Sequence, residues 1–210
     1  MTDTLHVYAF GSLCRGDISP ASDIDLLAAV TGGANELSRS MFSIYSHRKL
    51  ARIWTEGNPF AWHLHLEAKL IFASDGDDFL LSLGRPQKYT EAKKDCARFL
   101  AVFQSAHESA KVGRASIVFD LSAAFLGLRN FSSCLLLGRG QADFSRNVAL
   151  KIEDLAFPGD PTDYRTLEQA RLLCTRGYGT LPSMNAIESA VKSLPLIEAW
   201  MANLFEGNFA

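Results

Sequence analysis

The sequence lacks the features that mark a membrane-spanning, disulfide-stabilised or zinc-binding protein. No apolar run approaches the roughly 20 residues of a membrane span, and no basic segment precedes Leu5, so we expect neither a membrane partner nor a secretory signal. The four cysteines, Cys14, Cys96, Cys134 and Cys174, are far apart and have no CxxC spacing. They indicate reduced thiols of a cytoplasmic protein rather than a disulfide framework or a zinc site.

Basic residues are not in excess either. Lys and Arg number 21 and Asp and Glu number 23, which gives a net charge of -2. Proteins that bind long nucleic acid usually carry a basic footprint. We therefore expect small ligands or protein partners and no long nucleic acid. The 210 residues, 48% of them hydrophobic, suffice for one sizeable domain or two small ones.

The most informative stretch lies between two short apolar runs near the N-terminus. The first run, residues 5–10, ends at Gly11-Ser12, and the second, residues 24–30, begins beside Asp23 and Asp25. Short apolar runs that end at a glycine favour strands. Side chains two positions apart in a strand point the same way, so Asp23 and Asp25 are expected on one face. Two carboxylates beside a Gly-Ser turn can hold a divalent cation and a polyphosphate.

Three further elements are expected in the first half of the chain. Apolar residues at helical spacing favour a helix from Asn35 to about residue 52. Strict alternation over residues 60–72 favours a strand, with His63, His65, Glu67 and Lys69 on its polar face. A short helix is expected over residues 75–83, where acidic residues suit the N-terminal cap.

The second half shows helical periodicity and almost no strand signal. We expect helices over residues 91–111, 116–137, 162–178 and 183–205, and a further helix between residues 143 and 158. The predicted fold class is therefore α+β: an N-terminal mixed β-sheet domain with flanking helices over residues 1–86, followed by an α-helical bundle domain over residues 87–210.

The segments Gly11-Ser12, Ser22-Asp23 and Asp25-Leu26 resemble the signature of the polymerase-β-type nucleotidyltransferase superfamily. Within it, the run from Gly11 to Asp17 is similar to that of the bacterial minimal nucleotidyltransferases. A helical domain after the catalytic half is also similar to the antibiotic-modifying, aminoglycoside nucleotidyltransferase-like members. The resemblance is strong over about the first 30 residues and looser to Phe72.

The resemblance implies a set of site residues. The nucleotide-binding positions would be Gly11, Ser12, Arg15 and Ser22. The catalytic and metal-binding carboxylates would be Asp23, Asp25 and Glu67. In the family the third carboxylate lies on a neighbouring strand, and Leu66-Glu67-Ala68 has that pattern with glutamate. The alternative for Glu67 is a surface carboxylate paired with Lys69, and the alternative for Arg15 is a solvated loop arginine.

The implied activity is Mg²⁺-dependent transfer of a nucleoside monophosphate from ATP or another nucleoside triphosphate to a hydroxyl, with release of pyrophosphate. Two Mg²⁺ ions would neutralise charge at the phosphates. The acceptor would be a small molecule or a protein. Three other interpretations stay open: an antitoxin-like or regulatory module that binds a helical partner protein, an inactive nucleotide-binding scaffold, and a separate metal site on His63, His65 and Glu67. A homodimer through the apolar helical half is also possible.

Overall fold

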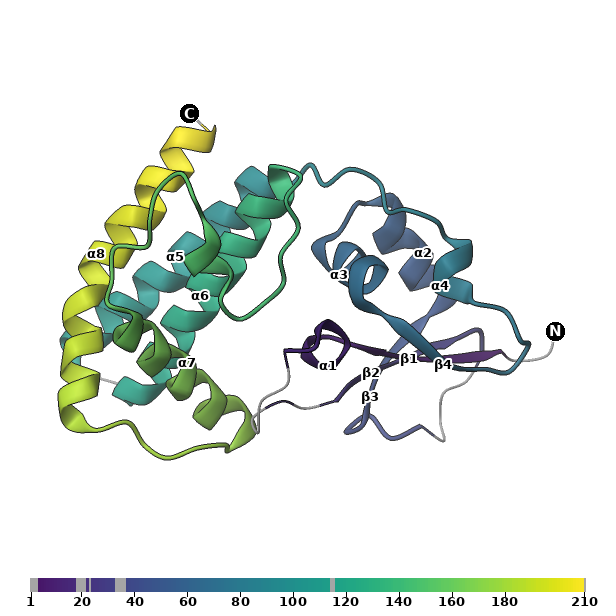
Figure 1. Cartoon of the computed structure of the whole chain (residues 1–210), viewed down its shortest axis with the longest axis horizontal. Coiled ribbons are helices and arrows are strands. Elements are labelled where there is room, and N and C mark those ends of the chain that lie inside the picture. Colours follow the sequence, from purple (N-terminus) through teal and green to yellow (C-terminus); the bar gives the residue numbers. More distant parts are fainter. Residues whose placement is uncertain (1–3, 18–21, 23, 33–36, 114–115, 210) are drawn as a thin grey trace. The chain divides into compact units, whose positions relative to one another are not determined.

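The computed structural model describes residues 4–17, 22, 24–32, 37–113 and 116–209. It divides into two compact units, residues 1–90 and residues 91–210 (Figure 1). The sequence predicts this boundary between residues 86 and 87. The first unit contains a sheet with helices and the second is helical, so the α+β fold class is confirmed at this level.

The first unit is organised around a four-stranded mixed sheet. Its strands are β1 (Leu5–Phe10), β2 (Asp25–Val30), β3 (Phe42–Ser46) and β4 (Lys69–Ala73), in the spatial order β3-β2-β1-β4. β1 lies between β2 and β4 and is antiparallel to both, whereas β2 and β3 are parallel. The strands predicted at the two N-terminal apolar runs are thus confirmed, with Asp23 outside the described residues.

Helices cover one face of this sheet and form the core of the unit. They are α2 (His47–Thr55), α3 (Pro59–Glu67) and the short α4 (Phe79–Ser82), while α1 (Ser12–Arg15) follows β1 directly. Their apolar side chains pack with those of β1 and β2 in one cluster that includes Tyr8, Leu27, Leu50, Trp54 and Leu64. This packing fixes the ends of the central strands, where the residues of the predicted site would lie.

Two predicted elements of the first unit are wrong. The expected helix from Asn35 to residue 52 contains β3 and then α2, whose first turn is capped by the Ser46 hydroxyl accepting from the Lys49 N–H. The expected strand over residues 60–72 is α3 followed by β4. The side chain of Asn58 caps α3 and Pro59 occupies its first turn, which are ordinary signals of a helix start.

The expected helix over residues 75–83 is shorter than predicted and spans only α4. Its acidic N-terminal cap is confirmed, because Asp78 Oδ1 accepts from the Leu81 N–H. Glycines at several turns have positive φ angles, and Gly11 is the one that matters for the site described below.

The second unit is a helical bundle built on α5 (Ala92–Val112) and α6 (Ile117–Gly138), with α7 (Pro161–Arg176) and α8 (Met184–Phe209) (Figure 1). These four helices confirm the predicted ones. The helix predicted between residues 143 and 158 is wrong, since that stretch forms only a short 3-10 helix, η1 (Val148–Lys151). Pro195 lies inside α8.

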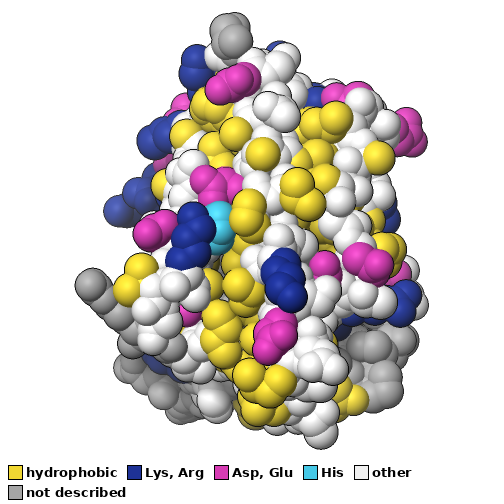
Figure 2. Space-filling view, turned by 90° about the vertical axis from the view of Figure 1, so that its left-hand side faces the viewer, with side chains coloured by type: hydrophobic (Ala, Val, Ile, Leu, Met, Phe, Trp, Pro, Cys, Tyr) yellow, Lys and Arg dark blue, Asp and Glu magenta, His cyan; other side chains and the backbone are white. Residues whose placement is uncertain are grey.

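α6 forms the centre of the bundle and contacts α5, α7, α8 and η1. Among the described residues it is the one helix that is long and apolar enough to cross a membrane by those two criteria alone, and 72% of its apolar window is buried within the protein. That burial is what the core helix of a bundle also shows. Figure 2 looks onto this helical unit, where hydrophobic side chains are interspersed with charged ones.

Candidate functional site

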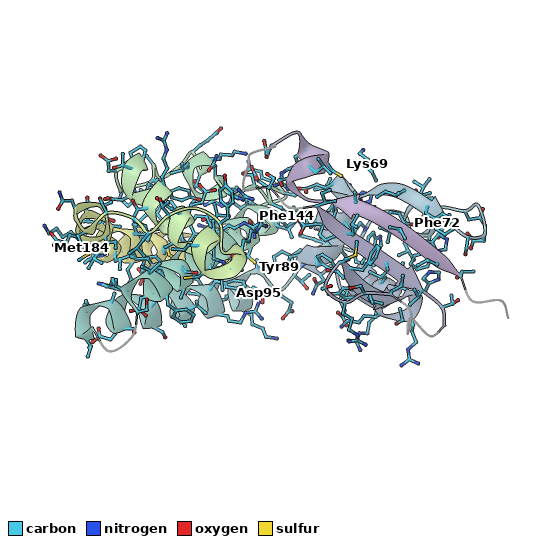
Figure 3. All side chains as sticks on the ribbon, turned by 90° about the horizontal axis from the view of Figure 1, so that it is seen from below. Lys69, Phe72, Tyr89, Asp95, Phe144 and Met184 are labelled. Carbon is cyan, nitrogen blue, oxygen red and sulfur yellow. The ribbon has the colours of Figure 1, made fainter. Side chains whose placement is uncertain are left out.

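The candidate site lies in the first unit, where the C-terminal end of β1 meets two neighbouring strands. Phe10, the last residue of β1, pairs with Asp25, the first residue of β2. On the other side of β1, Ala9 pairs with Lys69, the first residue of β4 (Figure 3). Antiparallel pairing on both sides therefore brings the start of β2 and the start of β4 to the point where the chain leaves β1 at Gly11.

Gly11 and Asp25 are in close contact. A Cβ atom placed on Gly11 would lie 2.5 Å from Asp25 Oδ2, which is far inside van der Waals contact. Gly11 also has φ 81° and ψ -150°, a conformation that is essentially restricted to glycine. Both the backbone angle and the neighbouring carboxylate thus require glycine here.

The residues after Gly11 form a tight helical turn that ends at a second glycine. Ser12 begins α1 and is buried, with 8% of its surface exposed. Gly16 ends α1 in the left-handed conformation, with φ 81°. The hydroxyl of Ser22 donates to the backbone carbonyl of Asp17 at 3.4 Å, which ties the end of the following loop to this turn.

Glu67 is the third carboxylate near this turn, and it is buried between two nitrogen donors. Its Oε2 accepts from Arg15 Nη1 at 2.5 Å and lies 2.8 Å from His63 Nε2. Only 7% of the Glu67 residue is exposed. The Nε of Arg15 also donates to Asp17 Oδ2 at 3.1 Å. Arg15 is therefore held by two carboxylates, and the solvated loop arginine considered from the sequence is wrong.

Glu67 lies on a different secondary-structure element from the predicted one. It was expected on the polar face of a strand beside His63, His65 and Lys69, but it is the last residue of α3. The alternative pairing with Lys69 is also wrong, because its partners are Arg15 and His63. The His63–Glu67 contact joins residues four apart, which face each other on a helix. That spacing was the available signal, and it was hidden by the alternation of apolar residues.

Charged groups of both signs meet around the side chain of Cys14. Burial raises the pKa of the Cys14 thiol; Lys69 and Arg15 lower it, and Glu67 and Asp25 raise it further. All four charged side chains are therefore within electrostatic range of one partly buried sulfur atom. A thiol with a raised pKa is a poor nucleophile, so Cys14 is suited to packing rather than to reaction.

The structure thus brings Gly11, Ser12, Arg15, Asp25 and Glu67 together, with Ser22 on the adjoining loop. Asp23 lies outside the described residues. Within the described part of the chain, no three His, Cys, Asp or Glu side chains are grouped so that they could hold a metal ion. The metal site predicted on His63, His65 and Glu67 as strand neighbours is wrong, because these residues lie on a helix.

The donor chemistry nevertheless suits a hard cation. Asp25 and Glu67 offer carboxylate oxygens, the ligands that Mg²⁺ prefers. Gly11 leaves open the space beside Asp25 Oδ2 that a larger residue would fill. Glu67 is bonded to Arg15, so it would have to exchange or share that partner before it could bind a cation. Both carboxylates therefore offer suitable oxygen ligands, and Glu67 would act as one after its contact with Arg15 changes.

Comparison with known proteins adds no family assignment. No protein-family model matches the chain, and no curated protein matches it significantly.

Proposed function

We propose that this chain is a metal-dependent nucleotidyltransferase that transfers a nucleoside monophosphate from a nucleoside triphosphate such as ATP to a hydroxyl group, with release of pyrophosphate. The observation that carries the proposal is the contact between Gly11 and the Asp25 carboxylate. These residues belong to the two halves of the motif on which the sequence resemblance rests. Their contact at the end of β1 supports the resemblance, because the motif was defined by sequence alone and not by closeness in space.

The roles of the remaining residues follow from their chemistry. The turn at Gly11-Ser12 would receive the terminal phosphates, and Arg15 would form charge-assisted hydrogen bonds to phosphate oxygens. Asp25, with Asp23 and Glu67, would hold Mg²⁺, which when bound neutralises charge on the triphosphate. The acceptor is a hydroxyl of a small molecule or of a protein.

Glu67 is the group that would accept the proton. The acceptor hydroxyl oxygen forms a bond to the α-phosphorus while its O–H bond breaks and the proton passes to the Glu67 carboxylate. The bond from the α-phosphorus to the bridging oxygen breaks in the same exchange, and its electron pair leaves with pyrophosphate. The 2.8 Å contact with His63 would keep the carboxylate oriented during this transfer.

The ion pair between Arg15 and Glu67 implies that Arg15 binds phosphate before Glu67 accepts the proton. While Arg15 donates to Glu67, the guanidinium occupies the carboxylate oxygen that would otherwise accept the proton. A triphosphate carries more negative charge than one carboxylate and competes for the guanidinium. Transfer of Arg15 to phosphate would release Glu67 only when nucleotide is bound, which would limit futile proton transfer.

A binding experiment tests the proposal without knowledge of the acceptor. Isothermal titration with Mg²⁺ and a non-hydrolysable ATP analogue should give binding to the wild-type chain and a loss of at least tenfold for Asp25→Asn. The matched control is Glu56→Gln, which removes an exposed carboxylate at the C-terminal cap of α2, outside the site. Equal affinity of the wild-type chain and Asp25→Asn, or no binding at all, would contradict the proposal.

A transfer assay then addresses the chemistry. α-Labelled ATP is incubated with the chain and a panel of hydroxyl compounds, including aminoglycosides, and label transfer and pyrophosphate release are measured together. Glu67→Gln should bind the nucleotide analogue yet lose transfer, because the amide cannot accept the proton. Undiminished transfer by Glu67→Gln would remove Glu67 from the proposed role.

A further inference from the structure

A groove on the helical unit has a buried carboxylate in a mostly apolar wall. It runs along one side of α5 and the first two turns of α6, and its volume is about 570 Å³. Pockets of that size bind small organic ligands. Its lining includes Val102 and Ala106 of α5 and Phe119, Asp120 and Ala123 of α6. None of these residues has a role in the proposed nucleotidyl transfer.

The position of Asp120 on α6 directs its side chain at α5. Asp120 precedes Gly127 by seven residues, and residues seven apart lie on the same face of a helix. Gly127 packs against α5, because a Cβ atom there would lie 2.9 Å from the backbone nitrogen of Phe103. The Asp120 side chain therefore lies at the base of the groove, between the two helices that form it.

The carboxylate of Asp120 is buried without a donor. Only 3% of the residue is exposed, and its Oδ2 has no hydrogen-bond partner. The hydroxyls of Ser105 and Ser109 line the same groove, yet Oδ2 accepts from neither. The first turn of α6 places the carboxylate near the positive end of the helix dipole, which favours its charge but supplies no N–H group. Burial of such a group without a donor costs free energy, so an N–H donor from outside the chain would be favourable.

The other charges around the groove do not neutralise Asp120. Among the described residues that line the groove, Arg98 is the one Lys or Arg side chain. Its Nη2 lies 3.2 Å from Asp95 Oδ1, so its charge already has a partner. Arg98 is near the start of α5, whereas Asp120 is beside the end of α5, because only residues 113–116 join the two helices. Residues 98 and 109, at the two ends of the groove, are about 16 Å apart along α5.

We propose that the groove between α5 and α6 binds a small organic ammonium ion. The ammonium N–H groups donate to Asp120, and the apolar part of the ligand lies on Phe119 and Val102. Because no hydrogen bond holds Asp120 Oδ2, the carboxylate can turn toward the ammonium without losing a partner. This site is independent of the proposed nucleotidyl transfer.

The chemistry of the lining favours an organic cation over other ligands. The Phe119 side chain is 61% exposed and offers both apolar area and an aromatic face that attracts cations. A neutral apolar ligand would leave the Asp120 carboxylate without a donor. A metal ion requires several oxygen ligands, and Asp120 is the one carboxylate among the described residues of the lining.

Nuclear magnetic resonance of the full chain with three probes of equal chain length tests the proposal. Hexylammonium should shift the methyl signals of Val102 and Ala123 and bind at least tenfold more tightly than hexan-1-ol, because hydrogen bonds between charged groups are the stronger ones. Hexanoate should bind more weakly than hexan-1-ol. Equal affinity for hexylammonium and hexan-1-ol, or unchanged methyl signals with hexylammonium, would overturn the proposal.

Variants separate the carboxylate from the apolar wall. Asp120→Asn should lower the affinity for hexylammonium at least tenfold and leave that for hexan-1-ol unchanged. Its control, Glu108→Gln, removes an exposed carboxylate of α5 outside the groove and should bind as the wild type does. Phe119→Ala should weaken both probes, whereas Leu196→Ala, at an exposed position of α8, should weaken neither. Unaltered hexylammonium binding by Asp120→Asn would contradict the proposal.

The stability of the chain without ligand distinguishes a binding role of Asp120 from a structural one. Asp120→Asn removes a buried charge that has no partner, so the urea midpoint of the helical unit should be unchanged or higher. A lower midpoint would show that the carboxylate stabilises the fold by itself and would overturn the proposal. At ten times its Kd, hexylammonium should lower the unfolding equilibrium constant of the wild-type chain about elevenfold and change that of Asp120→Asn much less.

Discussion

Replacement of Gly11 by alanine is the most informative perturbation of the candidate site. The new Cβ would lie 2.5 Å from Asp25 Oδ2, and the backbone angles of φ 81° and ψ -150° strain any residue with a side chain. Gly16 offers a matched control, since it also has φ 81° but a Cβ there would meet nothing within 4 Å. The two substitutions therefore differ in their contact with the carboxylate and in ψ.

The cost of Gly11→Ala can be worked from these two contributions. Alanine in a sparsely populated backbone region costs about 1–3 kcal/mol. Asp25 must move off its rotamer to relieve the contact, which costs about 0.5–1.5 kcal/mol. The free energy of unfolding should therefore fall by about 1.5–4.5 kcal/mol. Gly16→Ala should cost about 1–2 kcal/mol, the usual penalty for a left-handed L-residue.

The assay is urea denaturation followed by tryptophan fluorescence, since Trp54 and Trp62 both lie in the first unit. Gly11→Ala is measured in the wild-type chain and in an Asp25→Ala background, which removes the clashing carboxylate. The double-mutant cycle should recover the contact share of about 0.5–1.5 kcal/mol. An equal cost of Gly11→Ala in both backgrounds would refute the close approach, and with it the main support for the proposed function.

Two further substitutions test the packing of the separate units. Tyr8→Phe should lower the free energy of unfolding by about 1–3 kcal/mol, because the Tyr8 hydroxyl accepts from the Leu80 N–H and donates to Asp78 Oδ1, each at 2.9 Å, and both of these groups would lose a partner. Tyr45→Phe on β3 is the control in the same urea assay. Gly127→Ala should destabilise the helical unit by about 1–3 kcal/mol in thermal denaturation, because its Cβ would lie 2.9 Å from backbone atoms of α5. Gly207→Ala, with open space around it, should be neutral or stabilising, and equal effects of the two glycine changes would contradict the close helix packing.

Local signals in the sequence were sufficient for several elements. β1 and β2 follow from short apolar runs bounded by Gly11 and Asp25, and the helices of the second unit follow from their 3.6-residue periodicity. The acidic cap of α4 at Asp78 also follows from residue type alone. In each case the residues that decide the structure are neighbours in the chain.

Other elements depended on competition between local signals. The apolar residues of 60–72 alternate as in a strand, yet the cap at Asn58 and Pro59 starts a helix there. Packing of Trp62 and Leu64 into the core is compatible with that helix, because both are buried on it. β3 is a strand because it pairs in parallel with β2, a partner that its own sequence does not identify.

By itself the sequence determined the mixed α+β composition, the two central strands and the presence of a glycine turn beside acidic residues. Only the tertiary structure decided how these residues meet. Arg15 and Glu67 are 52 positions apart, and His6 and Asp75 are 69 apart. Such contacts depend on strand order and helix packing, which pair residues by distance in space. A sequence pattern contains only the spacing of residues along the chain. It could therefore identify the candidate carboxylates but not the residues that they contact.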